Sequence, residues 1–173
     1  MSLKFIRKTK SPDHIEELSK RIRNAPDVVV GFPFSLRSNQ AAREPNGASV
    51  VDVAIWNNFG TKTIPERRFM EASKKQITKA TESDRRKYVK AIMDGKMDPE
   101  QALEILGVKS VMVIRRVIND WSDPPNSPLT INGGWITLPN GKKCYIKGKK
   151  VNNPLVDTGL MRNMVTWELR KKD

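Results

Sequence analysis

Asp98-Pro99-Glu100-Gln101 marks the start of a long helix near the middle of the chain. Asp98 stands at the N-cap, Pro99 at the first helical position, and Gln101 three residues after the cap, where its side chain can bond back to the cap residue. The apolar residues that recur at helical spacing after this start predict the buried face of the helix: Leu103, Leu106, Val113, Val117 and Trp121.

A second long helix is predicted directly upstream, over residues 66–94, and Gly95 ends it. The apolar stripe predicted for this helix consists of Phe69, Ile77, Ala80, Tyr88 and Ile92. Because only about four residues separate the two helices, we expect them to form a helical hairpin.

The N-terminal part of the chain predicts a shorter helix over residues 12–24, with Ser11 as its N-cap. Ile15, Leu18 and Ile22 lie at helical spacing along it, and Pro26 stops it. The residues before this helix, 1–10, are expected to form a flexible arm.

Two strands are predicted at opposite ends of the chain. Residues 27–32 contain three consecutive valines and indicate a buried strand, and residues 164–169 alternate in the manner of a final strand. Between them, residues 35–47 are polar and indicate a long mobile loop. Residues 49–60 fit a short helix capped by Ser49, with an edge strand as the alternative.

Residues 121–153 form a second long loop region with three prolines near its start. A β-hairpin is predicted within it, with strands at 135–138 and 143–146 around the Asn140-Gly141 turn. The whole chain, 1–173, therefore indicates one α+β domain: a small, mostly antiparallel sheet packed by a long helical hairpin, with an additional β-hairpin and extended loops.

The charge of the chain is strongly positive, with 32 Lys and Arg against 19 Asp and Glu and a net charge of +13. Such an excess favours nucleic acid, an acidic membrane face or an acidic protein as partner. The lysines are dense in residues 141–150, at Lys142, Lys143, Lys147, Lys149 and Lys150. No apolar run approaches the roughly 20 residues of a membrane-spanning helix.

Catalytic chemistry finds little support in the residue inventory. His14 is the only histidine and Cys144 the only cysteine, so neither a zinc site nor an internal disulfide nor a His-activated nucleophile is expected. The single cysteine also makes the reducing cytoplasm the expected place of synthesis. We therefore predict no enzyme activity, no cofactor and no metal.

Val156-Asp157-Thr158-Gly159 contains the Asp-Thr-Gly of aspartic proteases, but only 14 residues follow Gly159, too few for the rest of such a β-barrel. The interpretation that fits better is a turn. In it, Asp157 or Thr158 bonds neighbouring backbone and Gly159 supplies a backbone angle that other residues resist.

Nucleic-acid binding has one candidate region, residues 135–150, where Trp135 and Tyr145 stand among the five lysines. Aromatic stacking combined with phosphate contacts holds single strands in known proteins. The alternative is that the two aromatic residues pair across the hairpin and stabilise it.

Four segments in a fixed order carry a resemblance to a known family: 54–61, 64–70, 124–130 and 154–161. They resemble the tail-completion and head–tail joining proteins of long-tailed bacteriophages, also called virion morphogenesis proteins. Asn58 stands where that family usually has Glu, and Arg68 where it usually has Pro. These departures and the inserted hairpin indicate a divergent branch.

The resemblance implies a non-enzymatic ring component of the virion, at the neck or tail end, made in the cytoplasm of the bacterial host. It implies assembly with further copies, expected as a hexamer, and contacts with the tail tube or tail terminator protein and with head connector proteins. The basic loops would meet genomic DNA without reading its sequence, or dock on an acidic connector surface; no membrane contact is implied.

The residues that the resemblance places in family motifs, and which we expect at an assembly interface, are Asn57, Asn58, Gly60, Thr61, Pro65, Arg67, Arg68, Phe69, Pro125, Asn126, Thr130, Pro154, Asp157, Thr158 and Gly159. One specific hypothesis is that Arg67 or Arg68, both badly placed for the dipole of the following helix, contacts an adjacent protomer. The alternative function is a basic nucleic-acid-binding accessory protein in phage DNA packaging or morphogenesis.

Overall fold

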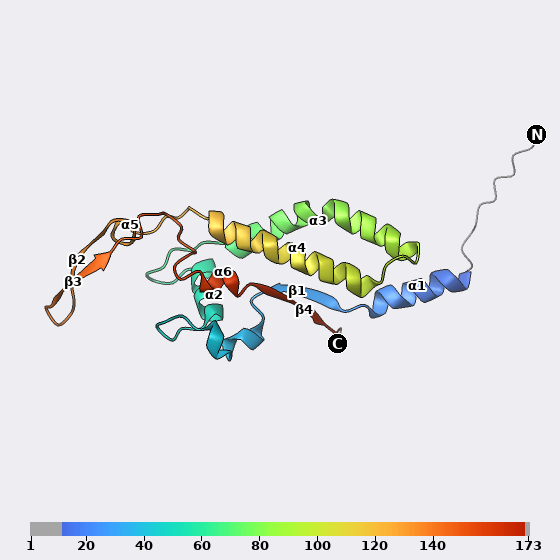
Figure 1. Cartoon of the computed structure of the whole chain (residues 1–173), viewed down its shortest axis with the longest axis horizontal. Helices are drawn as coiled ribbons and strands as arrows, with labels where there is room; N and C mark the ends of the chain where they lie inside the picture. The colour runs from blue at the N-terminus through green and yellow to red at the C-terminus, as the bar shows by residue number, and fades with distance from the viewer. Residues whose placement is uncertain (1–11, 172–173) are drawn as a thin grey trace, which may run out of the picture.

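Two antiparallel helices form the longest part of the molecule, α3 (Phe69–Met93) and α4 (Pro99–Asp120) (Figure 1). The computed structural model describes residues 12–171. The flexible N-terminal segment expected at 1–10 and the Ser11 cap therefore lie outside the described residues. The predicted capping box opens α4, where the backbone N–H of Asp98 donates to Gln101 Oε1 at 3.3 Å. The helical hairpin is thus confirmed, and so is the α+β class.

The predicted first and last strands pair with each other and lie against α4. β1 (Asp27–Gly31) and β4 (Thr166–Arg170) form a two-stranded antiparallel sheet in which Val30 stands opposite Trp167. Gly107 of α4 faces the Trp167 ring so closely that a Cβ there would lie 2.8 Å from the indole. A side chain at this position of α4 would therefore push the helix away from the sheet.

The buried face of α4 differs from the predicted one. Of the five residues predicted for it, Val117 is buried, and the other four are only partly covered. The residues that are buried are Ala102, Gly107, Ser110, Val111, Ile114, Val117 and Ile118. The physical reason is that α4 packs on α3 with one side and on the sheet with another, so its buried face is wide and centred between the two.

On α3, the buried stripe also departs from the prediction. Ala80 is exposed, while the polar Ser73 and Thr81 are buried. Thr81 satisfies its hydroxyl by donating to the carbonyl of Ile77 at 2.8 Å. A pattern built on apolar residues alone misses such positions.

The predicted short helix is present as α2 (Val50–Phe59), and the edge-strand alternative is excluded. Its N-cap is Ser49, whose side chain accepts from the N–H of Val51 at 3.3 Å. The segment predicted as a long loop, 35–47, lies beside it and contains two 3-10 helices, η1 (Phe34–Arg37) and η2 (Gln40–Ala42). The second of them buries Ala42 completely.

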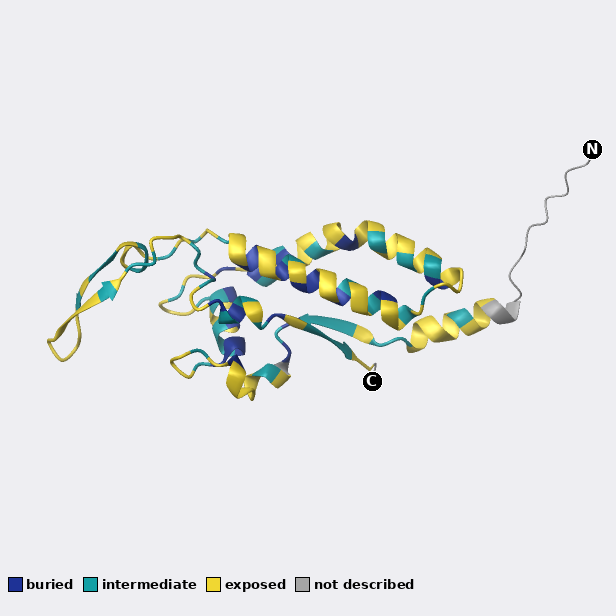
Figure 2. Ribbon diagram, viewed as in Figure 1, coloured by how far each residue is buried: buried dark blue, intermediate teal, exposed yellow. Residues whose placement is uncertain are grey.

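Two parts of the chain project from opposite ends of this body (Figure 1). α1 (Pro12–Asn24) extends beyond the turn between α3 and α4. At the other end lies the predicted β-hairpin, β2 (Gly133–Thr137) and β3 (Lys143–Lys147), which we call the arm together with the short helix α5 (Pro128–Asn132) before it. Figure 2 shows that both projections are largely exposed, in contrast to the inner sides of α2, α3 and α4.

The base of the arm is a tight crossing of two backbone segments. The N–H groups of Lys149 and Lys150 donate to the carbonyls of Thr130 and Ile131 at 2.9 and 2.8 Å. A Cβ at Gly148 would lie within 2.5 Å of the backbone of residues 131–133. After the arm the chain returns to the body through one further short helix that the sequence did not predict, α6 (Leu160–Asn163), which contacts α2 and α4.

Candidate interaction surfaces

The end of α2 positions the start of α3 through one side chain. Asn58 is buried, and its Oδ1 accepts from the N–H of Met70 in the first turn of α3 at 3.0 Å. Arg68 occupies the N-cap position of α3 but makes no capping bond with its side chain. Asn58 therefore caps α3 from a neighbouring helix, and its Nδ2 donates to Glu71 in the same turn at 3.4 Å.

The helix was predicted to begin at Glu66, but α3 begins at Phe69. The reason is a tight turn that connects α2 to α3. After Gly60 the N–H of Thr61 donates to the carbonyl of Ile64 at 2.8 Å, and Thr61 Oγ1 accepts from the N–H of Ile64 at 3.0 Å. Pro65 follows in an exposed position. The side chains of Thr61 and Asn58 thus fix this connection by accepting hydrogen bonds from backbone N–H groups.

Arg67 points into the protein rather than toward a neighbour. It is only 5% exposed, and its Nε and Nη2 donate to the carbonyls of Pro124 and Pro125 at 3.1 and 3.3 Å. Its Nη1 donates to Asn57 Oδ1 at 3.3 Å, and its backbone N–H to the Asn57 carbonyl at 2.8 Å. The partners in these bonds are neutral oxygens, and burial lowers the pKa of Arg67 from its ordinary value.

The hypothesis of an inter-protomer contact is therefore corrected for Arg67, because its guanidinium is used within the chain. Arg68 is exposed and pairs with Glu66, and the hydrogen bond to Glu66 raises the pKa of Arg68. Arg68 is thus the member of the pair that faces outward.

The segment 154–161 leads into α6, which packs against α2. Leu155 and Met161 are buried in the core. Thr158 Oγ1 accepts from the N–H of Leu160 at 3.1 Å and donates to Glu44 at 2.8 Å, while Gly159 adopts a left-handed φ of +80°. The turn interpretation of Asp-Thr-Gly is confirmed for Thr158 and Gly159.

Asp157, the aspartate of that motif, lies on the surface. Its side chain is 86% exposed and pairs with Lys149 at 3.4 Å. Lys149 lies at the base of the arm, where its ammonium also donates to the carbonyl of Val156. This lysine therefore joins the arm to the body and is not part of the arm's free surface.

The remaining motif, 124–130, ties the loop after α4 to the base of the arm. The N–H of Asn126 donates to Asn152 Oδ1 at 3.0 Å, and Asn152 Nδ2 donates to the carbonyl of Ser122 at 3.0 Å. The N–H of Thr130 donates to Ser127 Oγ at 3.2 Å and so caps α5. Pro154 precedes the buried Leu155 and is partly covered.

The arm carries one face that combines aromatic and basic side chains. In the register of β2 and β3, Trp135 stands opposite Tyr145, and Lys143 and Lys147 lie two residues to either side of Tyr145. Because alternate residues of a strand share a face, these four side chains lie on the same side of the hairpin. We call them the basic–aromatic face.

The two rings on this face touch but are not covered. Their centroids are 5.4 Å apart with an interplanar angle of 65°, yet Trp135 is 70% and Tyr145 55% exposed. Lys142 and Cys144 are also exposed in the arm. Hairpin pairing of the aromatics is thus present, and it leaves both rings accessible to a ligand.

The comparisons with known proteins give no neighbour for this arrangement: no family model, no curated protein and no solved structure matches the chain. Among residues 12–171, no three His, Cys, Asp or Glu side chains are grouped closely enough to hold a metal ion. None of the helices in the described part of the chain has the length and apolar character needed to cross a membrane.

The sequence does not mark some of the contact residues. Glu44 and Asn152 hold two of the motif segments in place, and nothing in their local sequence marks their distant partners. An exposed apolar stripe on α4 was also missed, although its helical spacing is readable: Ile105, Val108 and Met112.

Proposed function

We propose that this protein is a non-enzymatic structural protein of a tailed phage or prophage, acting in tail completion or head–tail joining as an oligomeric ring component. The observation that supports the proposal is that the four resembling segments form one connected unit. Segment 54–61 caps and bonds segment 64–70, whose Arg67 bonds segment 124–130. Segment 154–161 leads into α6, which packs on α2.

Matches that arise by chance have no reason to meet in space, so the convergence of segments up to a hundred residues apart favours a shared fold over coincidence. We call the part of this unit that the first three segments form the junction: α2, the turn 60–68, the start of α3 and the loop residues Pro124 and Pro125. The buried members of the junction, Asn58 and Arg67, make their hydrogen bonds within the chain, which suits a scaffold more than a catalytic site.

The partners that follow from this proposal are further copies of the chain, the tail tube or tail terminator protein, and the head connector. The projecting α1 and the arm supply surfaces for them, because α1 leaves apolar side chains exposed and the arm leaves aromatic and basic ones exposed. The location proposed for the protein is the neck or tail end of the virion.

Electron microscopy of lysates from the phage or prophage with this gene deleted tests the proposal. We expect full heads separated from tails, or overlong tails, and restoration of joined particles by the wild-type gene supplied in trans. A gene carrying Lys74→Gln, an exposed position of α3, serves as a matched control that also restores them. Normal, infectious particles from the deletion would refute the proposal.

A second candidate function, nucleic-acid binding in packaging or morphogenesis, is favoured by the basic–aromatic face. Two exposed rings between two lysines match the combination of base stacking and phosphate contact that holds single strands. Fluorescence anisotropy with a labelled oligothymidine tests it. Binding that weakens steeply with salt supports this function, and no binding at physiological salt excludes it.

A further inference from the structure

The strand β1 has one edge without a neighbouring strand. Among residues 12–171, β1 pairs with β4 alone, so every second residue of β1 directs its N–H and carbonyl away from β4. Natural proteins usually protect such an edge with lysine, proline or a bulge. The middle of β1 is Val28-Val29-Val30, and its register with β4 runs without a bulge. The main-chain groups of this open edge select an extended strand as their ligand.

A hollow lies along this edge. Val29 and Val30 both line it, and consecutive residues of a strand point to opposite faces, so the hollow follows the edge of the sheet and not one of its faces. A second hollow, lined by Val30, Met70 and Ile114, continues it on the side of the helices. Within residues 12–171, neither hollow is lined by β4. Both therefore lie beside the edge that β4 leaves open.

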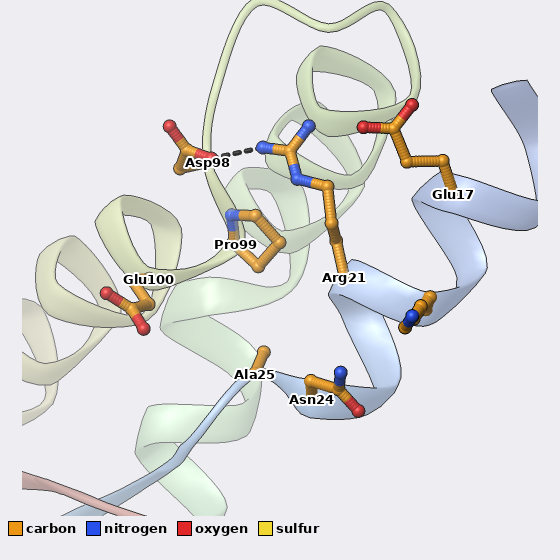
Figure 3. A pocket seen from close by; sticks show the side chains of 8 residues that line it. Glu17, Arg21, Asn24, Ala25, Asp98, Pro99 and Glu100 are labelled. Atoms are coloured by element: carbon orange, nitrogen blue, oxygen red, sulfur yellow. Dashed lines mark hydrogen bonds and ion pairs between the residues drawn. The ribbon is translucent and has the colours of Figure 1, made fainter.

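The second hollow contains a polar group that the described residues leave unpaired. Ser73 of α3 lines it and is 1% exposed, yet its Oγ has no hydrogen-bond partner within residues 12–171. The charged lining residues, Glu71 and Lys74, are exposed and offset each other. The hollow between α1 and α4 differs, because charged side chains line it and Arg21 pairs there with Asp98 (Figure 3). A buried hydroxyl without a partner costs free energy, so the hollow beside β1 favours a group that enters it.

The arm offers a strand of matching length. β1 and β3 each have five residues. In the described part of the chain, β3 pairs with β2 alone, so its other edge is open as well. The arm leads away from β1 at the far end of the molecule (Figure 1), and the elements that pack on its strands are each other and α5. It is therefore placed to reach β1 of a second copy and not β1 of its own chain.

The two sides of the β1 edge differ in chemistry. Val28 and Val30 lie on the side of the helices, next to the second hollow, whose lining is mainly apolar. Asp27 is exposed on the outer side of the sheet. Arg170 stands opposite Asp27 but pairs with Glu168 at 2.9 Å. A strand added to this edge thus meets an apolar side and a side that carries an acidic group.

The alternation of side chains along β3 has the same division. Cys144 and Ile146 lie on one face of the hairpin, and the lysines of β3 belong to the basic–aromatic face. When Cys144 and Ile146 point toward the helices, they meet the apolar hollow, and a lysine comes beside Asp27. A shift by one residue would turn the lysines into the apolar hollow, so the alternation excludes it.

We propose that β3 of the arm adds antiparallel to the open edge of β1 in a second copy, with Tyr145 opposite Val29 and Lys147 opposite Asp27. Antiparallel pairing is the more stable per residue. The strand β4 of a second copy is a poorer occupant, because the face that would enter the hollow already packs on its own α4. The contact joins two different surfaces, so it is head-to-tail and generates a ring where its rotation closes. The inference rests on the self-assembly part of the proposed function and not on the virion role.

Disulfide cross-linking with the native cysteine tests the contact directly. Opposite residues of antiparallel strands have Cα atoms about 4.5–5.5 Å apart, within reach of a disulfide. Val30→Cys should therefore link to Cys144 of the next copy and give a ladder of covalent oligomers on oxidation of the concentrated protein. The wild type has a single cysteine and gives dimers at most. Val29→Cys is the matched control: its thiol points to the other side of β1, so it should give no ladder.

Three results would overturn the proposal. The first is absence of a ladder from a folded Val30→Cys variant whose two thiols both react with a maleimide before oxidation. The second is a ladder of equal strength from Val29→Cys, which would show random collision. The third is dimers from Val30→Cys in a Cys144→Ser background, which would identify pairing of β1 with β1.

A charge test is independent of cysteine. Asp27→Lys and Lys147→Glu should each reduce the oligomers seen in sedimentation several-fold, because each sets like charges opposite one another, and the combined variant should restore them. Lys142→Glu, the same charge change in the turn of the arm, is the control and should leave the oligomers in place. A combined variant no better than the single ones would overturn the pairing. Failure of this contact together with separated heads and tails in the deletion would leave the virion role intact.

Discussion

The junction and the two projecting ends follow opposite physical rules. In the junction, buried polar groups find partners within the chain: Asn58 caps α3, and the guanidinium of Arg67 meets three oxygens. At the ends, α1 presents apolar side chains and the arm presents aromatic and basic ones to solvent.

This difference separates the residues that hold the fold from those that are available to partners. Satisfied buried polar groups make a region strongly dependent on each member, because removal of one leaves the others unpaired. Exposed side chains without such dependence affect folding little. Changes in the junction should therefore reduce stability, and changes at the ends should reduce association while leaving the fold intact.

The largest expected effect on stability comes from Arg67→Met. Methionine keeps the apolar stem but removes the donors to Pro124, Pro125 and Asn57, so we expect a loss of about 3 kcal/mol in the free energy of unfolding. Urea unfolding followed by circular dichroism measures it. Arg68→Met is the matched control on the surface and should leave the unfolding curve in place. Equal losses of unfolding free energy in the two variants would contradict the distinction between a buried, bonded Arg67 and an exposed Arg68.

Asn58→Ala should have the next largest effect, a loss of about 1 to 2 kcal/mol, because the N–H of Met70 loses its capping acceptor inside the protein. The same unfolding experiment measures it. Asn58→Asp retains an oxygen acceptor at the start of α3 but brings a carboxylate beside Glu71, so its stability should fall between those of Asn58→Ala and the wild type. An aspartate variant no more stable than the alanine variant would argue against capping.

Substitutions in the arm should change DNA binding rather than stability. If the basic–aromatic face holds single-stranded DNA, Lys143→Gln combined with Lys147→Gln should weaken oligothymidine binding. The slope of log affinity against log salt should then become shallower by about 0.7 for each lysine. The urea midpoint should not move. Lys74→Gln with Lys75→Gln on α3 is the control of equal charge change, and an equal loss from the control would show binding to net charge alone.

The smallest effect is expected where α3 and α4 are joined by a partly exposed ion pair, Asp84 with Lys109. The hydrogen bond from Lys109 lowers the pKa of Asp84 below its ordinary value of 3.8. A carboxyl group with a lowered folded-state pKa stabilises the protein at neutral pH and loses that contribution as the pH falls through the folded-state pKa. The difference in Tm between wild type and Asp84→Asn should therefore be small at pH 7 and shrink as the pH is lowered below 3.8; a difference that does not change with pH would exclude the ion pair as its cause.

The parts of the fold that the sequence predicted are those with local signals. The capping box at Asp98, the Ser49 cap and the Asn140-Gly141 turn each mark a boundary through residues a few positions apart, and each element is present. The buried face of α4 differs from the predicted one because it depends on the packing of α4 against α3 and the sheet. A short stretch of sequence does not contain that information.

The sequence identified the segments of the candidate site but not the direction in which the Arg67 side chain points. The first three motif segments do meet, yet Arg67 was expected to contact an adjacent protomer because it is badly placed for the dipole of the following helix. Its burial depends on the carbonyls of Pro124 and Pro125, nearly sixty residues later in the chain. The partner of Thr158, Glu44, is 114 residues away and equally invisible to local reasoning.

The glycine crossing at the base of the arm has a mechanical consequence. Since the backbone at Gly148 fits directly against residues 131–133, the two ends of the arm are held together at this point. Strands of five residues reach roughly 17 Å from that pivot. The strand length thus sets how far the tip lies from this crossing, and two more residues in each strand would move it outward by about 7 Å without disturbing the junction.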